Sequence, residues 1–421
     1  MSSITKPVML DSTGRLIVDG IARQNLLLTQ LISATAEATP VATLREIHEI
    51  VRAGEAANVF SIGDQINLNY NDGDKDYVLP FDIVHFGYVE LQDGETVPGM
   101  FIQSHYAMQN VQFDQNEGFF VVPAGGIAPG TYQFTMGNSW GSNVQSGAVY
   151  SFTTTESYAE GDIWQLGRAN TEVSALSDAA PSVWRVRTYK TVGTVPAGLA
   201  ATPTEVLELT ASSSGTDLGT LSSSTKYGAS GLNNMQRSSL GYNRWGQSAL
   251  RQFLNSSAAA DAWWTPQNPY DRRPEQLATL PGFMAGFEEA FLNIIQPVKV
   301  VTALNTMSDS EIGTTEVTYD TFFPASLEQE YCVPQLVGAE GEYWEYWKRR
   351  LGLSSPQVSG TANANHIRYA YNARTLGQIC WLRSASRFGA YNPWLVNSSG
   401  NINNYYGATF AYRCAPACVI C

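Results

Sequence analysis

The feature that most limits how this chain can fold is the composition of residues 384–412. This segment is mostly Asn, Ser, Gly and Tyr, residue types that cannot fill a packed core. Apolar residues nevertheless frame it, with Trp381 and Leu382 before it and an apolar run ending at Cys421 after it. We therefore expect short strands and turns that expose most of their side chains and are held by a scaffold built elsewhere in the chain.

Two interpretations suit such a segment. Tyr gives a large amphipathic contact at low entropic cost and Asn gives adaptable hydrogen bonds, which is the chemistry of an antibody-type paratope. The alternative is a solvated loop or edge hairpin, which the same composition commonly forms. Composition leaves both open. The candidate ligand-binding residues are Phe388, Tyr391, Asn392, Leu395, Asn397, Asn401, Asn403, Asn404, Tyr405, Tyr406, Thr409, Phe410 and Tyr412.

Three sets of residues add a resemblance. They are the frame Trp381-Leu382-Arg383-Ser384, the skeleton Ala390, Trp394, Val396 and Gly400, and the closing Arg413-x-Ala415-Pro416-Ala417. Together they resemble the variable proteins of diversity-generating retroelements, which carry a C-type-lectin fold and are often receptor-binding proteins of bacteriophages. The helical and aromatic stretches between residues 240 and 330 resemble the body of the same proteins, so that the resemblance covers about residues 160–421.

In that family a reverse transcriptase rewrites template adenines, so that AAC codons for Asn become codons for many residues while the third base stays C. Phe, Gly, Tyr, Pro, Leu and Thr, all present in the segment, can be reached in this way. Lys, Glu, Gln and Met cannot be reached, and all four are absent from Ser384 to Tyr412. The resemblance therefore implies a diversified ligand-binding surface.

The expected fold class is α+β, with three parts. Residues 1–45 contain the apolar stretch Leu16-Ile17-Val18 but too little for a core, and we expect an attachment or oligomerisation arm. Residues 46–157 show strand-length apolar runs separated by Gly, Pro, Asn and Asp, which predict a β-sandwich-like module. Residues 158–421 form the expected C-type-lectin-like domain.

Three helices are predicted inside this plan. Thr43-x-x-Glu46 is a capping-box pattern and predicts a short helix that ends near Gly54. Apolar spacing predicts a second helix that begins near Ala249 and a third that runs from Gly282 to Ile295. We interpret the last two as core helices.

The charge and the motifs exclude several functions. A net charge of −13 argues against a broad nucleic-acid interface, which needs clustered Lys and Arg. The chain has no phosphate-binding glycine loop, nucleophile elbow or zinc-protease motif, so we expect no enzyme and no cofactor. Its five cysteines lack a second ligand cluster, and we expect buried free thiols and no metal site, with calcium left open.

The resemblance also implies location and partners. No apolar segment of membrane-spanning length or signal peptide is visible, and we expect a protein made in the host cytoplasm and carried on a phage particle, for example on a tail fibre. Its partners would be a bacterial surface receptor, protein or glycan, other virion proteins at the N-terminal region, and further copies of itself, as a homotrimer. The alternative is a structural or decorative virion protein with an inert lectin-like domain.

Overall fold

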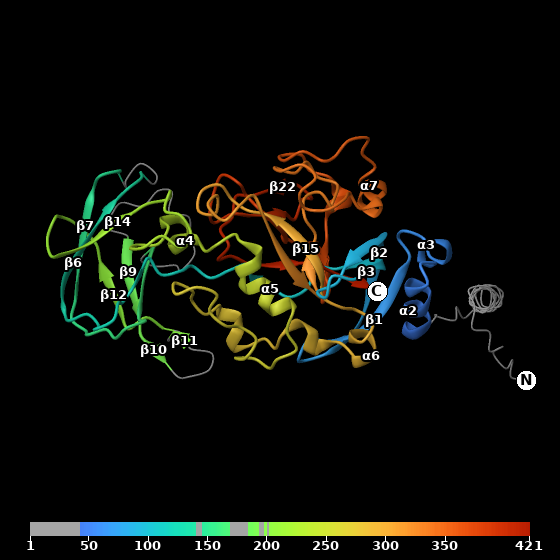
Figure 1. The fold of residues 1–421 in the computed structure, drawn as a ribbon, viewed down its shortest axis with the longest axis horizontal. Coiled ribbons are helices and arrows are strands. Elements are labelled where there is room, and N and C mark those ends of the chain that lie inside the picture. The colour runs from blue at the N-terminus through green and yellow to red at the C-terminus, as the bar shows by residue number, and fades with distance from the viewer. Residues whose placement is uncertain (1–42, 140–144, 169–183, 193–197, 200–201) are drawn as a thin grey trace, which may run out of the picture.

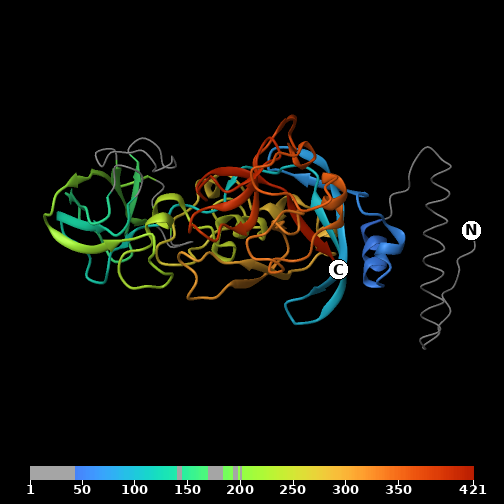
Figure 2. The same ribbon diagram turned by 90° about the horizontal axis from the view of Figure 1, so that it is seen from above.

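The computed structural model describes residues 43–139, 145–168, 184–192, 198–199 and 202–421 (Figure 1). The expected arm lies outside these ranges up to residue 42. The described chain is a β-rich α+β fold with two bodies, which we call the sandwich (residues 119–221) and the mixed body (residues 43–118 and 222–421). The sandwich lies at one end of the elongated molecule and α2 near the other, as both views show (Figure 2).

A five-stranded sheet joins the two ends of the described chain in the mixed body. Its order is β1-β2-β3-β24-β17. The C-terminal strand β24 runs antiparallel to β3, with Cys418 opposite Ile102. Alternation along β1 is strict, because every second residue is buried. The strands are β1 (Gln65–Asn71), β2 (Asp76–Glu90), β3 (Thr96–Ser104), β17 (Phe323–Pro324) and β24 (Pro416–Ile420).

A second five-stranded sheet carries the C-terminal segment. Its order is β22-β21-β20-β23-β4, and β20 and β23 are parallel neighbours. Two smaller pairs complete the mixed body, β15 with β16 and β18 with β19. The strands are β4 (Val111–Gln112), β15 (Val298–Ala303), β16 (Thr315–Asp320), β18 (Tyr369–Ala370), β19 (Ala373–Gly377), β20 (Cys380–Ala385), β21 (Pro393–Val396), β22 (Ile402–Asn403) and β23 (Ala411–Cys414).

The sandwich consists of two four-stranded sheets around an aromatic core. The sheet orders are β12-β9-β8-β5 and β13-β7-β6-β14, and the core between them contains Phe119, Phe134, Phe152 and Trp164. A short pair, β10 with β11, is attached. The strands are β5 (Phe120–Val121), β6 (Gly130–Met136), β7 (Val149–Thr154), β8 (Ile163–Arg168), β9 (Trp184–Tyr189), β10 (Thr191–Val192), β11 (Gly198–Leu199), β12 (Glu205–Glu208), β13 (Thr210–Ala211) and β14 (Thr216–Leu221).

This pairing differs from the expected division at residues 157 and 158. β1 to β3 were assigned to the β module, yet they pair with β24 and belong to the mixed body. The sandwich instead continues past residue 158 through β8 to β14 and is inserted between β4 and α4. The reason is that β3 pairs with the apolar C-terminal strand β24. The paired residues lie about 300 positions apart, so no local sequence pattern indicates this contact.

The helices are short and cover the sheets. Thr43 caps α2 through the predicted capping box with Glu46, which confirms that helix, and α5 confirms the second prediction. The α-helices are α2 (Leu44–Arg52), α3 (Ala56–Val59), α4 (Met235–Leu240), α5 (Ala249–Leu254), α6 (Glu289–Leu292) and α7 (Glu345–Leu351). The 3₁₀ turns are η3 (Trp245–Gln247), η4 (Glu275–Ala278), η5 (Phe283–Gly286) and η6 (Ala364–His366).

The prediction of one helix from Gly282 to Ile295 is wrong. The stretch contains η5 and α6, with an extended residue, Phe287, between them. Phe287 forms a β-bridge with Tyr70 of β1, and a Cβ on Gly286 would lie 2.4 Å from the Asn71 carbonyl oxygen. The close approach of β1 therefore interrupts the helix.

Two other properties concern the whole described chain. All five cysteines are buried free thiols, as expected. Among the described residues, no helix has the length and apolar character needed to cross a membrane.

Candidate functional site

The strand that precedes the candidate segment, β20, is buried along its whole length. Arg383 donates from its guanidinium to the main-chain oxygens of Glu340 at 2.6 Å and Pro324 at 3.1 Å. Ser384 donates to the Glu340 carboxylate at 2.6 Å, and burial raises the pKa of this carboxyl. Since β20 also pairs on both sides, with β21 and β23, the segment begins from a fixed position.

Residues 386–392 form a loop that one buried side chain holds. The Asn243 amide nitrogen lies 3.2, 2.7 and 3.0 Å from the carbonyl oxygens of Ser386, Gly389 and Asn392. Within this loop Phe388 is 77% exposed. The loop therefore exposes the Phe388 ring to solvent, while Asn243 holds its main chain from the buried side.

Residues 397–401 form the turn between β21 and β22. The Asn397 side-chain oxygen accepts from the Ser399 and Asn401 main-chain N–H groups at 2.9 and 3.0 Å. This is the local side chain to main chain bonding by which Asn favours turns. Asn397 and Asn401 are half-buried and build the turn.

The loop after β22 turns one side chain outward and ties itself to the first loop. Tyr405 is 74% exposed. Its neighbour Asn404 donates to the Ser386 hydroxyl at 3.0 Å. The hydrogen bond joins the two loops, and we call their residues Phe388, Asn404 and Tyr405 the aromatic patch.

The remaining aromatic candidates face the protein. Tyr406, Phe410 and Tyr412 contact one another, with ring centroids 5.2–5.6 Å apart, and Tyr412 packs 5.2 Å from the buried Trp381. Burial raises the pKa of Tyr412. Tyr391 packs against the sandwich core. These half-buried rings pack against the scaffold, so only part of each ring is accessible to a ligand.

Four candidates are buried, which corrects the expectation that they point outward. They are Asn392 (7% exposed), Leu395 (0%), Asn403 (3%) and Thr409 (1%). Leu395 was expected to point outward because Leu is one of the residue types that the rewritten Asn codons can encode. However, β21 is covered on both faces, since Trp394 and Val396 join one apolar cluster and Leu395 joins the main core. Asn392 donates to the Tyr406 carbonyl oxygen, and Asn403 accepts from the Tyr405 N–H. The main-chain N–H of Thr409 donates to the Leu240 carbonyl oxygen of α4.

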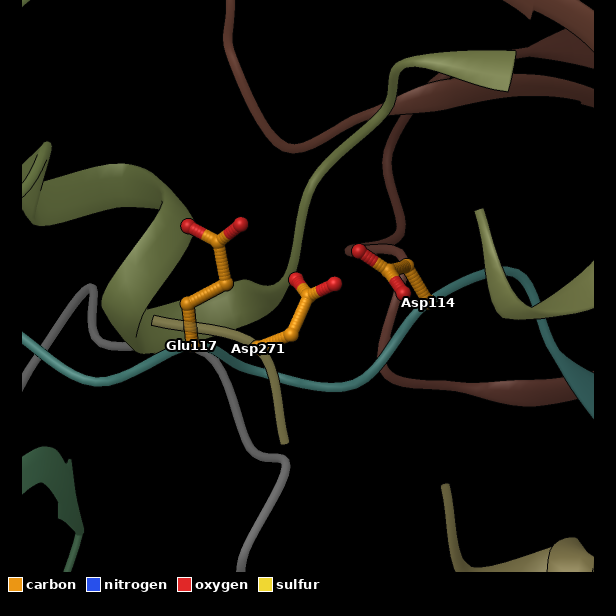
Figure 3. Close-up of side chains that lie close together, drawn as sticks. All are labelled: Asp114, Glu117 and Asp271. Carbon is orange, nitrogen blue, oxygen red and sulfur yellow. The ribbon is translucent and has the colours of Figure 1, made fainter. Parts of the chain in front are cut away.

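A second cluster, which sequence reasoning missed, lies where the sandwich joins the mixed body. Asp114, Glu117 and Asp271 are all buried, and their carboxylates converge, with one oxygen from each within 4.8 Å of the others. Figure 3 shows Asp271 between the other two side chains. Asp114 and Glu117 belong to the segment that runs from β4 to β5, whereas Asp271 lies more than 150 residues away, and no sequence pattern links them.

Side chains of three residues donate hydrogen bonds to this carboxylate cluster. Arg237 of α4 donates to both oxygens of Glu117, at 2.8 and 2.7 Å. Asn233 donates to Glu117 at 2.7 Å, and Asn268 donates to Glu117 at 3.0 Å and to Asp271 at 2.8 Å. A bidentate Arg–carboxylate pair is strong in a site of low dielectric, and here it links the two segments of the mixed body that lie on either side of the sandwich in the chain.

Among the described residues, the other two carboxyls of the cluster form no ion pair with Lys or Arg. Burial and the nearby Glu117 charge raise the pKa of Asp271 to about 8, and burial and the Asp271 charge raise the pKa of Asp114 well above its usual range. Asp271 therefore holds a proton near neutral pH. Three carboxylates are also a ligand set for a hard cation such as Ca²⁺. However, Asn268 turns its N–H toward the cluster, which supplies hydrogen bonds and no further ligand oxygen.

One family of known sequences is similar to this chain. Residues 221–420, just under half of the chain, match the family described as "Domain of unknown function (DUF6273)". The match begins at the end of the sandwich and continues through β24, so it contains the aromatic patch and excludes β1 to β3. Neither the curated proteins nor the solved structures contain a match.

Proposed function

We propose that the protein is a binding protein without catalytic activity, which attaches a bacteriophage particle to a bacterial surface ligand through the aromatic patch. The observation that carries this proposal is the exposure of Phe388 and Tyr405 on loops whose main chain is held by buried hydrogen bonds. Large exposed rings contribute nothing to the packed core here. Their exposure is useful when a partner covers them.

The rigidity of the loops supports the same proposal. Asn243 fixes the loop that carries Phe388, and the bond from Asn404 to Ser386 fixes the loop that carries Tyr405. A surface that is ordered before binding loses less conformational entropy when it binds. Asn404 beside the two rings adds a polar group, and this mixture suits a protein epitope or a glycan.

The finer parts of the proposal rest on the resemblance of the C-terminal frame. We propose a C-type-lectin-like fold for residues 222–421 and diversification of the segment by a retroelement. The coding DNA tests the second point. Codons ending in C at Phe388, Asn404 and Tyr405, with a near-copy of the segment beside a reverse-transcriptase gene, are expected. Codons without that bias would contradict it.

The second candidate function is a structural virion protein with an inert domain. The burial of Leu395, Asn392, Asn403 and Thr409 favours it, because a segment so closely packed has less freedom to vary. The two candidates differ in what the aromatic patch does. A structural protein would lose nothing when Phe388 and Tyr405 are truncated.

Binding to cells distinguishes the two. The fluorescently labelled protein is titrated against a panel of bacterial strains by flow cytometry, and the strain that binds best is then tested with the double variant Phe388→Ala/Tyr405→Ala. Aromatic hot spots contribute about 2 kcal/mol or more each, so we expect a loss of affinity of about a hundredfold or more. Val78→Ala/Val206→Ala, which truncates exposed side chains on other strands, is the matched control. Equal binding by both double variants would overturn the proposal.

A further inference from the structure

Two strands of the mixed body meet at one point and then separate. Leu91, the residue after β2, forms an antiparallel bridge with Val298 of β15. Beside the bridge, Lys299 and Glu90 form an ion pair at 2.9 Å. Beyond it a cavity of about 670 Å³ lies between residues 85–90 of β2 and residues 299–301 of β15. We call this cavity and its two strand edges the seam.

The β2 edge of the seam has free main-chain groups. In the pairing of β2 with β3, Pro98 stands opposite Tyr88, and proline has no N–H to donate. Hydrogen-bonded and non-bonded residue pairs alternate in an antiparallel ladder, so Phe86 and Tyr88 direct their N–H and C=O groups away from β3. Among the described residues, β1 pairs with β2 only up to Asp82, and no strand pairs with this edge of β2 over residues 85–89.

The β15 edge faces the same space. Val301 accepts from Arg383 at 3.4 Å, and the Ala303 N–H donates to Glu340 at 3.1 Å, so these groups point away from β16 and toward the seam. The seam is therefore bounded by two strand edges. Side chains of the protein satisfy part of the β15 edge, and apart from the bridge at Val298 no strand pairs with this edge among the described residues.

The walls of the seam are aromatic, and its mouth is acidic. Phe101 and Trp344 lie 6.0 Å apart between ring centroids, and Tyr88, 75% exposed, stands at the opening. Glu342 is 86% exposed and lies 3.8 Å from His85, whose pKa burial lowers, so that the imidazole is neutral at pH 7. Among the described residues Glu342 forms no ion pair with Lys or Arg.

We propose that the seam binds an extended peptide segment of a partner protein by strand addition, with apolar side chains directed at Phe101 and Trp344 and a basic side chain near Glu342. Only a main chain offers N–H and C=O groups at the spacing of the unpaired edge of β2. The acidic mouth selects a positively charged segment. This proposal does not depend on the function of the aromatic patch.

The test uses defined peptides and the full chain. The probe is a fluorescein-labelled hexapeptide of alternating Lys and Val, and its binding is followed by fluorescence anisotropy. The first control is the same peptide with N-methyl groups on alternate amides, which removes half of the N–H donors and keeps every side chain. The second control is the peptide of alternating Glu and Val. We expect each control to bind at least about tenfold more weakly, the effect of one or more lost hydrogen bonds or charge contacts. Equal binding of the N-methylated peptide would overturn strand addition.

Variants locate the binding at the seam. Tyr88→Pro removes an N–H that faces the cavity and no ladder hydrogen bond, whereas Tyr88→Ala removes the ring and keeps the N–H. We expect Tyr88→Pro to weaken binding at least about tenfold relative to Tyr88→Ala. Ala339→Trp, which fills the cavity from its wall, should abolish binding even if Tyr88→Pro fails to fold. Unchanged binding by Ala339→Trp would overturn the proposal. So would a change in oligomeric state caused by either cavity variant, because a second copy of this chain would then occupy the seam.

Discussion

Tyr405 and Tyr406 are neighbours in sequence and opposite in structure. Tyr405 is 74% exposed, whereas Tyr406 packs against Phe410 and Tyr412 with centroids 5.2 Å apart. The same contrast divides the whole candidate segment. Phe388 lies outside with Tyr405, and Leu395 and Thr409 lie inside.

The difference shows that a segment with the composition of a paratope can bury four of its candidate binding residues. Its inward residues pack into the core, and this packing holds the loops that carry the outward residues. The two sides should respond differently to substitution, because inward residues contribute to folding and outward residues contribute to binding. Three substitution experiments test whether the two sides differ in this way, and the one with the largest expected effect comes first.

The largest effect is expected for Leu395→Ala. The side chain is fully buried in the main core, so its truncation removes apolar burial and leaves a cavity. We expect the free energy of unfolding, measured by urea denaturation, to fall by about 2–5 kcal/mol. The control is Leu376→Ala, because Leu376 is 70% exposed and should change stability by less than about 0.5 kcal/mol. If both variants lost the same free energy of unfolding, Leu395 would not contribute to the core as we expect.

A smaller effect on stability is expected from a substitution in the carboxylate cluster, which contacts the buried side of the segment. The Asp114 N–H donates to the Ala408 carbonyl oxygen at 3.0 Å, which ties the cluster to the segment. Asp271 has a pKa of about 8 in the folded protein against 3.8 as a free group. Between these values the folded state keeps a proton that the unfolded state loses, so the contribution is unfavourable and grows as the pH rises from about 4 to 8.

Asp271→Asn should therefore reduce the fall in unfolding free energy between pH 5 and pH 8. The slope is the quantity to compare, because the amide also loses an acceptor for Asn268 and lowers stability at every pH. Urea denaturation at pH 5, 6.5 and 8 measures it, and Asp74→Asn at an exposed turn is the control. Identical slopes in Asp271→Asn and the parent protein would show that this carboxyl is ionised throughout.

Sequence reasoning found what local physics determines. The capping box of Thr43 and Glu46, the alternation of β1 and the apolar face of α5 each depend on residues within a few positions. It missed what distant contacts determine. The pairing of β3 with β24 and the approach of Asp271 to Asp114 join residues far apart in the chain, and neither has a periodic pattern.

Within the segment, the residue types predicted which side chains could form ligand contacts, but they did not predict which side chains point outward. Phe388 and Tyr405 were correctly expected outside, yet Asn392 and Asn403 were expected there for the same reason and are buried. Asn suits a buried loop as well as a surface, because its amide can satisfy main-chain groups that no strand pairs. Asn392, for example, donates to the Tyr406 carbonyl oxygen at 3.3 Å.

The smallest effect is expected for Phe388→Ala/Tyr405→Ala, measured as stability. Both rings are about three-quarters exposed, so their truncation should change the free energy of unfolding by less than about 0.5 kcal/mol per site. Tyr406→Ala is the contrast, with an expected loss of about 1–3 kcal/mol because its ring packs on two others. A double variant that unfolds as easily as Tyr406→Ala would mean that the aromatic patch is part of the core. The surface proposed to meet a ligand would then not exist, because binding and folding would depend on the same side chains.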